Sequence, residues 1–141
     1  MKTIIRDFLN SDYPDLLRLL NAVYDSKIDF DTLLVNYISS NKSILIAEID
    51  SRLVGCAFIE MQEDFIRPGK VIYVTYVAVD AAYRGNGIGS QLFRKIEERG
   101  KENHCASIQL TSADFREGAH KFYQAIGFSK KKTTVFIKEI E

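Results

Sequence analysis

The sequence predicts an α+β fold built on a central mixed, mostly antiparallel sheet with helices on both faces. Its elements follow in the order β-α-α-β-β-β-α-β-α-β, which is neither a strict βαβ alternation nor an all-β pattern. Residues 71–79 (VIYVTYVAV) are apolar at nearly every position, as in a central strand buried on both faces. The strand–helix–strand segment 71–111 favours a right-handed crossover between parallel strands, and the hairpin-like strands before it favour antiparallel pairing.

Length and composition are typical of one globular domain, residues 1–141, because 46% of the residues are apolar and 27% are charged. Basic and acidic residues balance at 19 each, so no global basic field draws the chain to nucleic acid. No stretch approaches the ~18 apolar residues that span a bilayer, and no signal peptide is evident, so we expect a cytoplasmic protein without a membrane partner. Cys56 and Cys105 lack metal-ligand spacing and are expected to be reduced core residues.

The N-terminal half is expected to form a strand, two helices and a pair of strands. Residues 2–6 form the first strand. Ser11 or Asp12 can cap the helix that follows, and Pro14 lies in its first turn, where a missing N–H costs little. The other elements are a short helix at 30–38 and strands at 43–49 and 52–61.

The C-terminal half alternates helices with strands. Leu92, Phe93 and Ile96 recur at helical spacing, and Gly100 is a plausible stop for their helix. Gly127 fits the left-handed position after the next helix. The elements are a helix at 88–99, a strand at 107–111, a helix at 116–126 and a last strand at 133–140 (TTVFIKEI).

The segment after the central strand carries the most specific signal. A buried strand enters a loop with alternating glycines, YRGNGIGS, which runs directly into a helix. Glycines let main-chain N–H groups converge on a ligand, and a helix N-terminus adds partial positive charge, so the segment is suited to a pyrophosphate. Arg84 can add a charge-assisted bond.

Three other interpretations of this loop compete. Asn86-Gly87 alone is compatible with a tight hairpin turn, but helical periodicity follows it. A P-loop requires a lysine after its glycines, which is missing here. A dinucleotide fingerprint requires G-x-G-x-x-G, whereas this sequence has G-x-G-x-G.

Two motifs resemble those of the GNAT superfamily of N-acetyltransferases. VAVDAAYRGNGIGSQL is similar to its acetyl-CoA motif, with Arg84, Gly87 and Gly89 at the core positions. Residues 119–128 (AHKFYQAIGF) resemble its second motif, A-x-x-F/Y-Y-x-x-x-G-F. The order, the separation and the surrounding elements also match, so the resemblance covers nearly the whole chain. It implies a GNAT fold and an acetyl-CoA-dependent N-acetyltransferase that needs no metal.

The resemblance also implies which residues bind acetyl-CoA. Main-chain groups of the central strand pair with the pantetheine arm, and N–H groups of the loop hold the pyrophosphate. In that family the central strand and the next one splay apart, and a bulge near 76–77 accompanies the splay. The implied binding residues are Val77, Ala78, Val79, Arg84, Gly85, Asn86, Gly87, Ile88, Gly89 and Ser90.

The resemblance also implies catalytic roles, and the sequence departs from the family pattern at two positions. At the first, Arg116 stands where many members carry Asn, and it could meet a CoA phosphate or be solvated. The second is Thr75. Tyr123 matches the tyrosine that often protonates the leaving thiolate. Thr75 stands where many members carry a Glu, which removes the commonest position for a base. Glu60 is our first candidate base, because its strand should neighbour the central one. Glu63, Asp64, Tyr73 and Tyr76 are the other candidates.

The acceptor side is expected between the first two helices, where carboxylates and aromatics cluster around Tyr24, Asp25 and Asp29. Such a rim favours a small cationic amine. Two alternatives stay open: a protein or peptide N-acetyltransferase, and a non-catalytic acetyl-CoA-binding or sensing module. Members of the family are often homodimers, which is the reason to consider a homodimer here.

Overall fold

The computed structural model describes residues 2–24 and 37–140. The chain divides into two compact units, Met1–Thr111 and Ser112–Glu141. Most of the helix expected at 30–38 lies outside the described residues. Among the described residues, no helix is long and apolar enough to cross a membrane.

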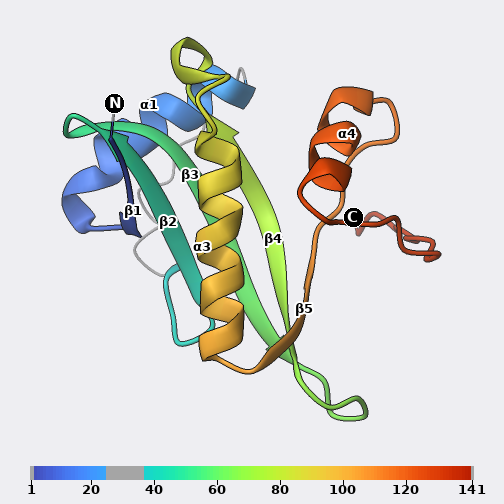
Figure 1. The fold of residues 1–141 in the computed structure, drawn as a ribbon. Coiled ribbons are helices and arrows are strands. Elements are labelled where there is room, and N and C mark those ends of the chain that lie inside the picture. The colour runs from blue at the N-terminus through green and yellow to red at the C-terminus, as the bar shows by residue number, and fades with distance from the viewer. Residues whose placement is uncertain (1, 25–36, 141) are drawn as a thin grey trace. The chain divides into compact units, whose positions relative to one another are not determined.

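The first unit is built on a five-stranded mixed sheet in the order β1-β2-β3-β4-β5 (Figure 1). The first four strands pair antiparallel, and β4 and β5 pair parallel through the crossover helix α3. This arrangement confirms the predicted mixed, mostly antiparallel sheet. The strands are β1 Thr3–Asp7, β2 Lys42–Ile49, β3 Arg52–Glu63, β4 Lys70–Val79 and β5 Cys105–Gln109.

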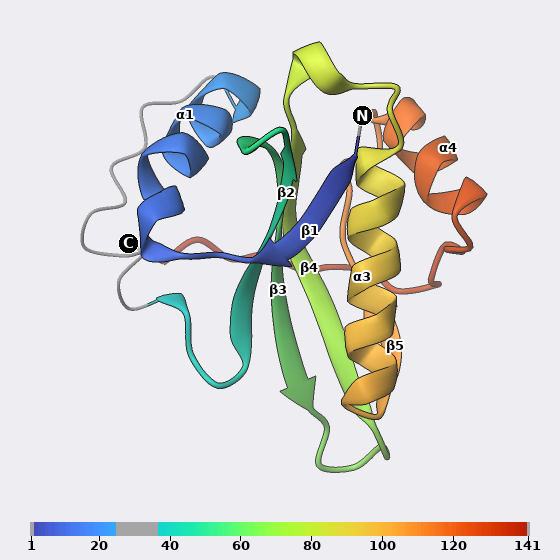
Figure 2. The same ribbon diagram turned by 60° about the vertical axis from the view of Figure 1, so that its left-hand side comes forward.

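Helices cover both faces of this sheet, as predicted (Figure 2). On one face lies α1 (Tyr13–Tyr24), whose apolar stripe of Leu16, Leu19 and Leu20 packs on alternate residues of the strands. On the other face lies α3 (Ile88–Glu102). There a Cβ added to Gly55 in β3 would lie 3.1 Å from the Ile88 Cγ2 atom, so the helix approaches the sheet closely at that glycine.

A partly buried ionic cluster connects β1 to the start of α1. Arg6 donates to both carboxylate oxygens of Asp12 at 2.7 Å and also to Glu48 of β2. The Asp12 carboxylate accepts a further bond from the Leu9 N–H at 2.7 Å. Asp12 lies in the 3₁₀ turn Asn10–Asp12 that precedes α1, so the cluster sets where the chain leaves the sheet and becomes helical.

The prediction that Gly100 ends its helix is wrong. The helix α3 continues to Glu102, and the Asn103 side chain then donates to the Arg99 carbonyl at 2.9 Å. A Cβ on Gly100 would lie 3.3 Å from the Ile72 Cδ1 atom. Gly100 therefore permits close packing of the helix on β4 and does not terminate it.

The second unit contains α4 (Glu117–Ala125), close to the expected bounds. Gly127 follows with φ +106°, and the Phe128 N–H donates to the Tyr123 carbonyl at 2.9 Å, so the predicted glycine termination is confirmed. The predicted strand at 133–140 is wrong, because the described residues after α4 form no strand. The segment has strand-forming side chains, but it is not part of the five-stranded sheet.

Both cysteines are free. Cys56 belongs to the core under α1, and its burial raises the pKa of the thiol to about 12. Cys105 begins β5 and is half-buried.

Candidate functional site

Strands β4 and β5 separate halfway along β4. Their pairing runs from Lys70↔Cys105 to Tyr73↔Gln109, where β5 ends. The strand β4 continues to Val79. Within the first unit, residues 74–79 therefore have a strand on the β3 side only, which agrees with the expected splay.

Main-chain polar groups of β4 point alternately to β3 and to this free edge. The Asp80 N–H donates to the Val54 carbonyl at 2.8 Å, so Asp80 faces β3. Because main-chain groups alternate in direction along an antiparallel pair, the N–H and C=O groups of Ala78 point to β3. Those of Val77 and Val79 point to the free edge. The Tyr24 hydroxyl of α1 donates to the Val77 carbonyl at 3.3 Å, which agrees with that direction. Of the three implied pantetheine residues, two present main-chain groups to the edge.

A β-bulge lies in the same stretch. Phe58 pairs with Tyr76 and the next residue, Ile59, pairs with Val74, so Thr75 is the extra residue on β4. The Thr75 hydroxyl donates to the Phe58 carbonyl at 3.4 Å. The bulge thus lies one residue before the expected position, at the threonine that occupies the family's usual glutamate position.

The loop after β4 is held by its own short-range bonds. The Asp80 carboxylate accepts from the Ala82 N–H at 3.0 Å, and the Tyr83 N–H donates to the Asp80 carbonyl at 2.9 Å, which forms the 3₁₀ turn Ala81–Tyr83. The Asn86 side chain donates to the Tyr83 carbonyl at 2.8 Å. Asn86 therefore stabilises the turn from within.

The two loop glycines leave space where a side chain would otherwise lie. Gly85 has φ +85° and Gly87 has φ +75°, and a Cβ on either one would meet no atom within 4 Å. Gly87 is the N-cap of α3, and no side chain caps that helix. The N–H groups of Ile88, Gly89 and Ser90 in the first turn are therefore available to an anion. Arg84 is exposed beside them.

An aromatic cluster lies beside the bulge on the α1 face. The Tyr76 ring contacts Tyr24 and Phe58 edge-on, with centroids 5.6 and 6.0 Å apart, and Phe58 contacts Tyr37 at 5.5 Å. The ammonium of Lys42 lies 5.5 Å from the Tyr37 ring centroid. Tyr24 was expected on the acceptor side, whereas Asp25 and Asp29 lie outside the described residues.

Glu60 and Tyr37 come together with Thr75. Glu60 follows Phe58 on the same face of β3 and accepts from the Gln62 side chain at 3.3 Å. Burial is the main cause that raises the pKa of Tyr37; the negative charge of Glu60 raises it further, while a hydrogen bond with Thr75 lowers it. Sequence analysis missed Tyr37, although its position on the apolar side of the expected helix 30–38 was a signal.

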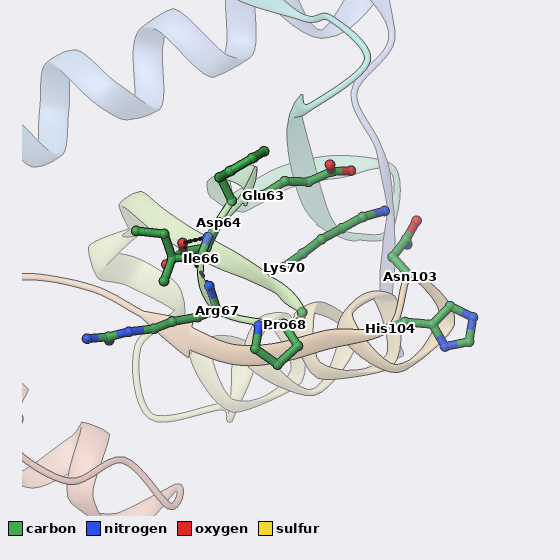
Figure 3. A pocket seen from close by; sticks show the side chains of 10 residues that line it. Glu63, Asp64, Ile66, Arg67, Pro68, Lys70, Asn103 and His104 are labelled. Carbon is green, nitrogen blue, oxygen red and sulfur yellow. Dashed lines mark hydrogen bonds between the residues drawn. The ribbon is translucent and has the colours of Figure 1, made fainter.

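The other acidic candidates lie towards the hairpin between β3 and β4. Asp64 accepts from the main-chain N–H groups of Ile66 and Arg67 at 2.9 and 3.1 Å, which lowers the pKa of its carboxyl. With Glu63 it borders a hollow of about 560 Å³ (Figure 3). This hollow lies at the opposite end of β4 from the glycine loop, about 30 Å away for a ten-residue strand. The described residues include no cluster of His, Cys, Asp and Glu that could hold a metal ion.

Tyr123 lies in α4 of the second unit. Its ring contacts Phe122 and Phe128 edge-on, with centroids 5.5 and 5.9 Å apart. Burial raises the pKa of its phenol, and the positive charge of Arg116 lowers it to a smaller extent. Burial thus favours the neutral phenol over the phenolate.

Comparison with known proteins identifies the family. The sequence model of the Acetyltransferase (GNAT) family matches residues 4–128. A probable glucosamine 6-phosphate N-acetyltransferase 2 of Oryza sativa subsp. japonica is 38% identical over 62% of this chain and 54% of its own length. The human N-alpha-acetyltransferase 30 is 28% identical over 84% of this chain and 33% of its own length. The chain thus spans about half or less of these curated relatives.

A solved structure has the same fold. AAC(6')-Iy, in complex with the bisubstrate analogue CoA-S-monomethyl-acetylneamine, aligns with a TM-score of 0.87, 17% identity and 99% coverage of both chains. Because the family match extends over most of the sequence and the observed fold agrees with it, the protein belongs to the acetyltransferase (GNAT) family.

Proposed function

We propose that residues 1–141 act as one N-acetyltransferase domain, which moves an acetyl group from acetyl-CoA to a primary amine of a small cationic molecule. The observation that carries this proposal is the free edge of β4, which leads directly into a glycine loop and an uncapped helix N-terminus. An extended arm that ends in a pyrophosphate requires this combination. The rice and AAC(6')-Iy relatives support an amino-sugar type of acceptor through their names.

The main chain supplies most of the coenzyme contacts in this proposal. Val77 and Val79 pair with the amide groups of the pantetheine arm, as an added strand would. The N–H groups of residues 84–90 hold the pyrophosphate, and Arg84 adds a charge-assisted bond. Acetyl-CoA supplies an activated acetyl group as its thioester. Thr75 at the bulge interrupts the ladder with β3, and an N–H freed there donates to the thioester carbonyl oxygen.

The acceptor amine approaches from the aromatic face in this proposal. Tyr24 and Tyr76 present ring surface beside the bulge, and a cation already occupies such a face at Tyr37, where the Lys42 ammonium lies. Rings of this kind attract an ammonium. Asp25 and Asp29 follow Tyr24 in the sequence, and on that ground we propose them as acidic acceptor-side groups.

Two proton transfers complete the reaction. An alkyl ammonium has a pKa of about 10, so it must lose a proton before it can attack. Glu60 is the proposed base, with the Tyr37 hydroxyl between it and the Thr75 bulge. Tyr123 is the proposed acid, which donates its phenolic proton to the leaving thiolate.

A peptide N-terminus is the second candidate acceptor. The observation in its favour is the match with human N-alpha-acetyltransferase 30, which extends over 84% of this chain. The acceptor-side groups do not exclude it, since a peptide N-terminus is also a cationic amine.

The test is free thiol release from acetyl-CoA in the presence of an amine panel: amino sugars, aminoglycosides, polyamines, amino acids and short peptides. The proposal expects release that depends on one small-amine class. Release with peptides alone would favour the second candidate. Tight CoA binding by calorimetry without release on any amine would replace the proposal with a sensing module, and absence of CoA binding would refute the site itself.

A further inference from the structure

Asp80 lies where β4 ends and the glycine loop begins, and each of its polar groups has a partner. Its N–H donates to the Val54 carbonyl of β3 at 2.8 Å, and its carbonyl accepts from the Tyr83 N–H at 2.9 Å. One carboxylate oxygen accepts from the Ala82 N–H at 3.0 Å. The other lies 3.6 Å from a guanidinium nitrogen of Arg18. Asp80 therefore fixes the start of the loop both to the sheet and to a helix.

Arg18 brings α1, the helix on the proposed acceptor side, to this point. It also donates to the Leu53 carbonyl at 3.2 Å, next to the Val54 that holds the Asp80 main chain. A second guanidinium, that of Arg52 in β3, lies 3.9 Å from the same Asp80 oxygen. The Asp80 side chain is only 15% exposed, so solvent and salt screen its pair with Arg18 less than they screen a fully exposed pair.

Two short steps connect Asp80 to the uncapped start of α3. Asp80 closes the 3₁₀ turn Ala81–Tyr83. The Tyr83 carbonyl accepts from the Asn86 side chain at 2.8 Å, and Gly87, the N-cap of α3, follows directly. The direction of the main-chain N–H groups at the pyrophosphate position thus depends on where Asp80 is held.

Charge alone does not explain an aspartate at this position. The loop is proposed to bind a pyrophosphate, and a carboxylate beside an anion site weakens binding by Coulomb repulsion. Arg18 and Arg52 offset that charge, but they would attract an anion more strongly without the carboxylate between them. The geometry that Asp80 imposes on the loop accounts for its presence.

We propose that Asp80 is a positioning residue for the coenzyme loop, and that the Arg18–Asp80 pair holds this loop and α1 in one arrangement before the coenzyme binds. Arg18 then affects the affinity for the coenzyme through Asp80 and without touching the coenzyme. The inference rests on the proposed function, because that function assigns acetyl-CoA to the loop.

Calorimetric titration with CoA separates geometry from charge, because the two predict opposite signs. Asp80→Asn keeps an oxygen that can accept from the Ala82 N–H, but it removes the charge that holds Arg18. The Kd for CoA is expected to rise about 2- to 5-fold, the size of effect that a partly exposed ion pair gives. If the carboxylate acted through its charge alone, the Kd would fall. A Kd equal to or lower than that of the wild type would overturn the proposal.

Thiol-release kinetics distinguish a positioning role from a catalytic one. In Asp80→Asn the KM for acetyl-CoA should rise by the same factor as the Kd, while kcat at saturating acetyl-CoA stays unchanged. A fall in kcat with an unchanged KM would contradict a role in holding the coenzyme loop.

A double-mutant cycle tests the link to α1. Arg18→Gln should also raise the Kd for CoA about 2- to 5-fold, and the double variant should show no more than the larger single effect. Asp15→Asn is the matched control, because Asp15 is a second carboxylate beside Arg18, 3.8 Å away and on α1 itself. It should leave the Kd unchanged. Additive effects of Arg18→Gln and Asp80→Asn, or an effect of Asp15→Asn equal to that of Arg18→Gln, would refute the link.

Hydrogen exchange in the ligand-free protein keeps this inference separate from the proposed function. Amides of residues 82–90 should exchange about 2- to 5-fold faster in Asp80→Asn and in Arg18→Gln than in the wild type, since the loop opens more often. Equal exchange rates would overturn the inference even if CoA binds. A wild type that binds no CoA would refute the proposed function, whereas faster exchange in both variants would still support the positioning of the loop by Asp80.

Discussion

Replacement of Gly87 by alanine tests two proposed roles of this residue separately. One is its left-handed main-chain conformation, and the other is the space that it leaves for the pyrophosphate of CoA. Gly87 has φ +75°, and a Cβ there would meet no protein atom within 4 Å. The fold therefore loses only the conformational preference of glycine, about 1–2 kcal/mol of unfolding free energy. The added methyl group projects into the space beside the first-turn N–H groups, where we place the pyrophosphate.

The effect on coenzyme binding is expected to exceed that strain. A hydrogen bond to a charged group contributes about 1.5–3 kcal/mol, so loss of one pyrophosphate bond raises the Kd for CoA about 10- to 100-fold. Gly87→Asn is the matched variant: asparagine tolerates a left-handed conformation better than alanine but is larger. It should regain part of the stability and still bind CoA poorly.

Calorimetric titration with CoA and urea unfolding measure these two quantities on the same preparations. If Gly87→Ala bound CoA within about twofold of the wild type while it lost the expected stability, the glycine would serve the turn alone. The pyrophosphate would then have to lie elsewhere.

Three further predictions concern single residues. Tyr123→Phe should lower kcat about 100-fold in the thiol-release assay while the Kd for CoA stays unchanged; unchanged kcat would exclude the acid role. Glu60→Gln should lower kcat/KM about 10- to 100-fold at pH 7, and the deficit should shrink as the pH approaches the amine pKa of about 10, whereas a deficit independent of pH would exclude a base. Asp12→Asn should lower the free energy of unfolding by about 2 kcal/mol at pH 7, because a neutral amide replaces the carboxylate that accepts two hydrogen bonds from Arg6. Arg6 lowers the pKa of the Asp12 carboxyl in the folded state. The Arg6–Asp12 pair therefore contributes fully to the free energy of unfolding above the unfolded pKa of about 3.9, and this contribution is lost as the pH falls through the lower folded pKa. Urea unfolding from pH 7 to pH 2 should therefore show the gap between Asp12→Asn and wild type closing in acid, and a constant gap would contradict the assignment.

Local patterns were sufficient to predict most of the elements. The apolar run 71–79 became β4, and the strands expected at 43–49 and 52–61 became β2 and β3 with bounds changed by two residues or fewer. The glycine loop was predicted as a turn that enters a helix, and Gly87 does cap α3 in a left-handed conformation. These features depend on side-chain periodicity and on main-chain dihedral angles, which neighbouring residues determine.

Gly100 and segment 133–140 show where such patterns fail. A glycine followed by polar residues is compatible with a helix end, but the contact of Gly100 with Ile72 involves a residue 28 positions away. A segment rich in β-branched residues becomes a strand only if another strand offers its hydrogen-bonding edge. Neither condition can be derived from the nearby sequence.

The amino-acid sequence alone determined the family, the glycine loop and the identity of the candidate groups, because short motifs and hydrophobic periods encode them. Only the tertiary structure decided that β4 keeps a free edge beyond Tyr73, that Val77 and Val79 rather than Ala78 point towards it, and that Tyr37 and Glu60 lie near the Thr75 bulge. These facts depend on register between strands distant in the sequence. A shift of one residue in that register would reverse the direction of every main-chain group along the edge.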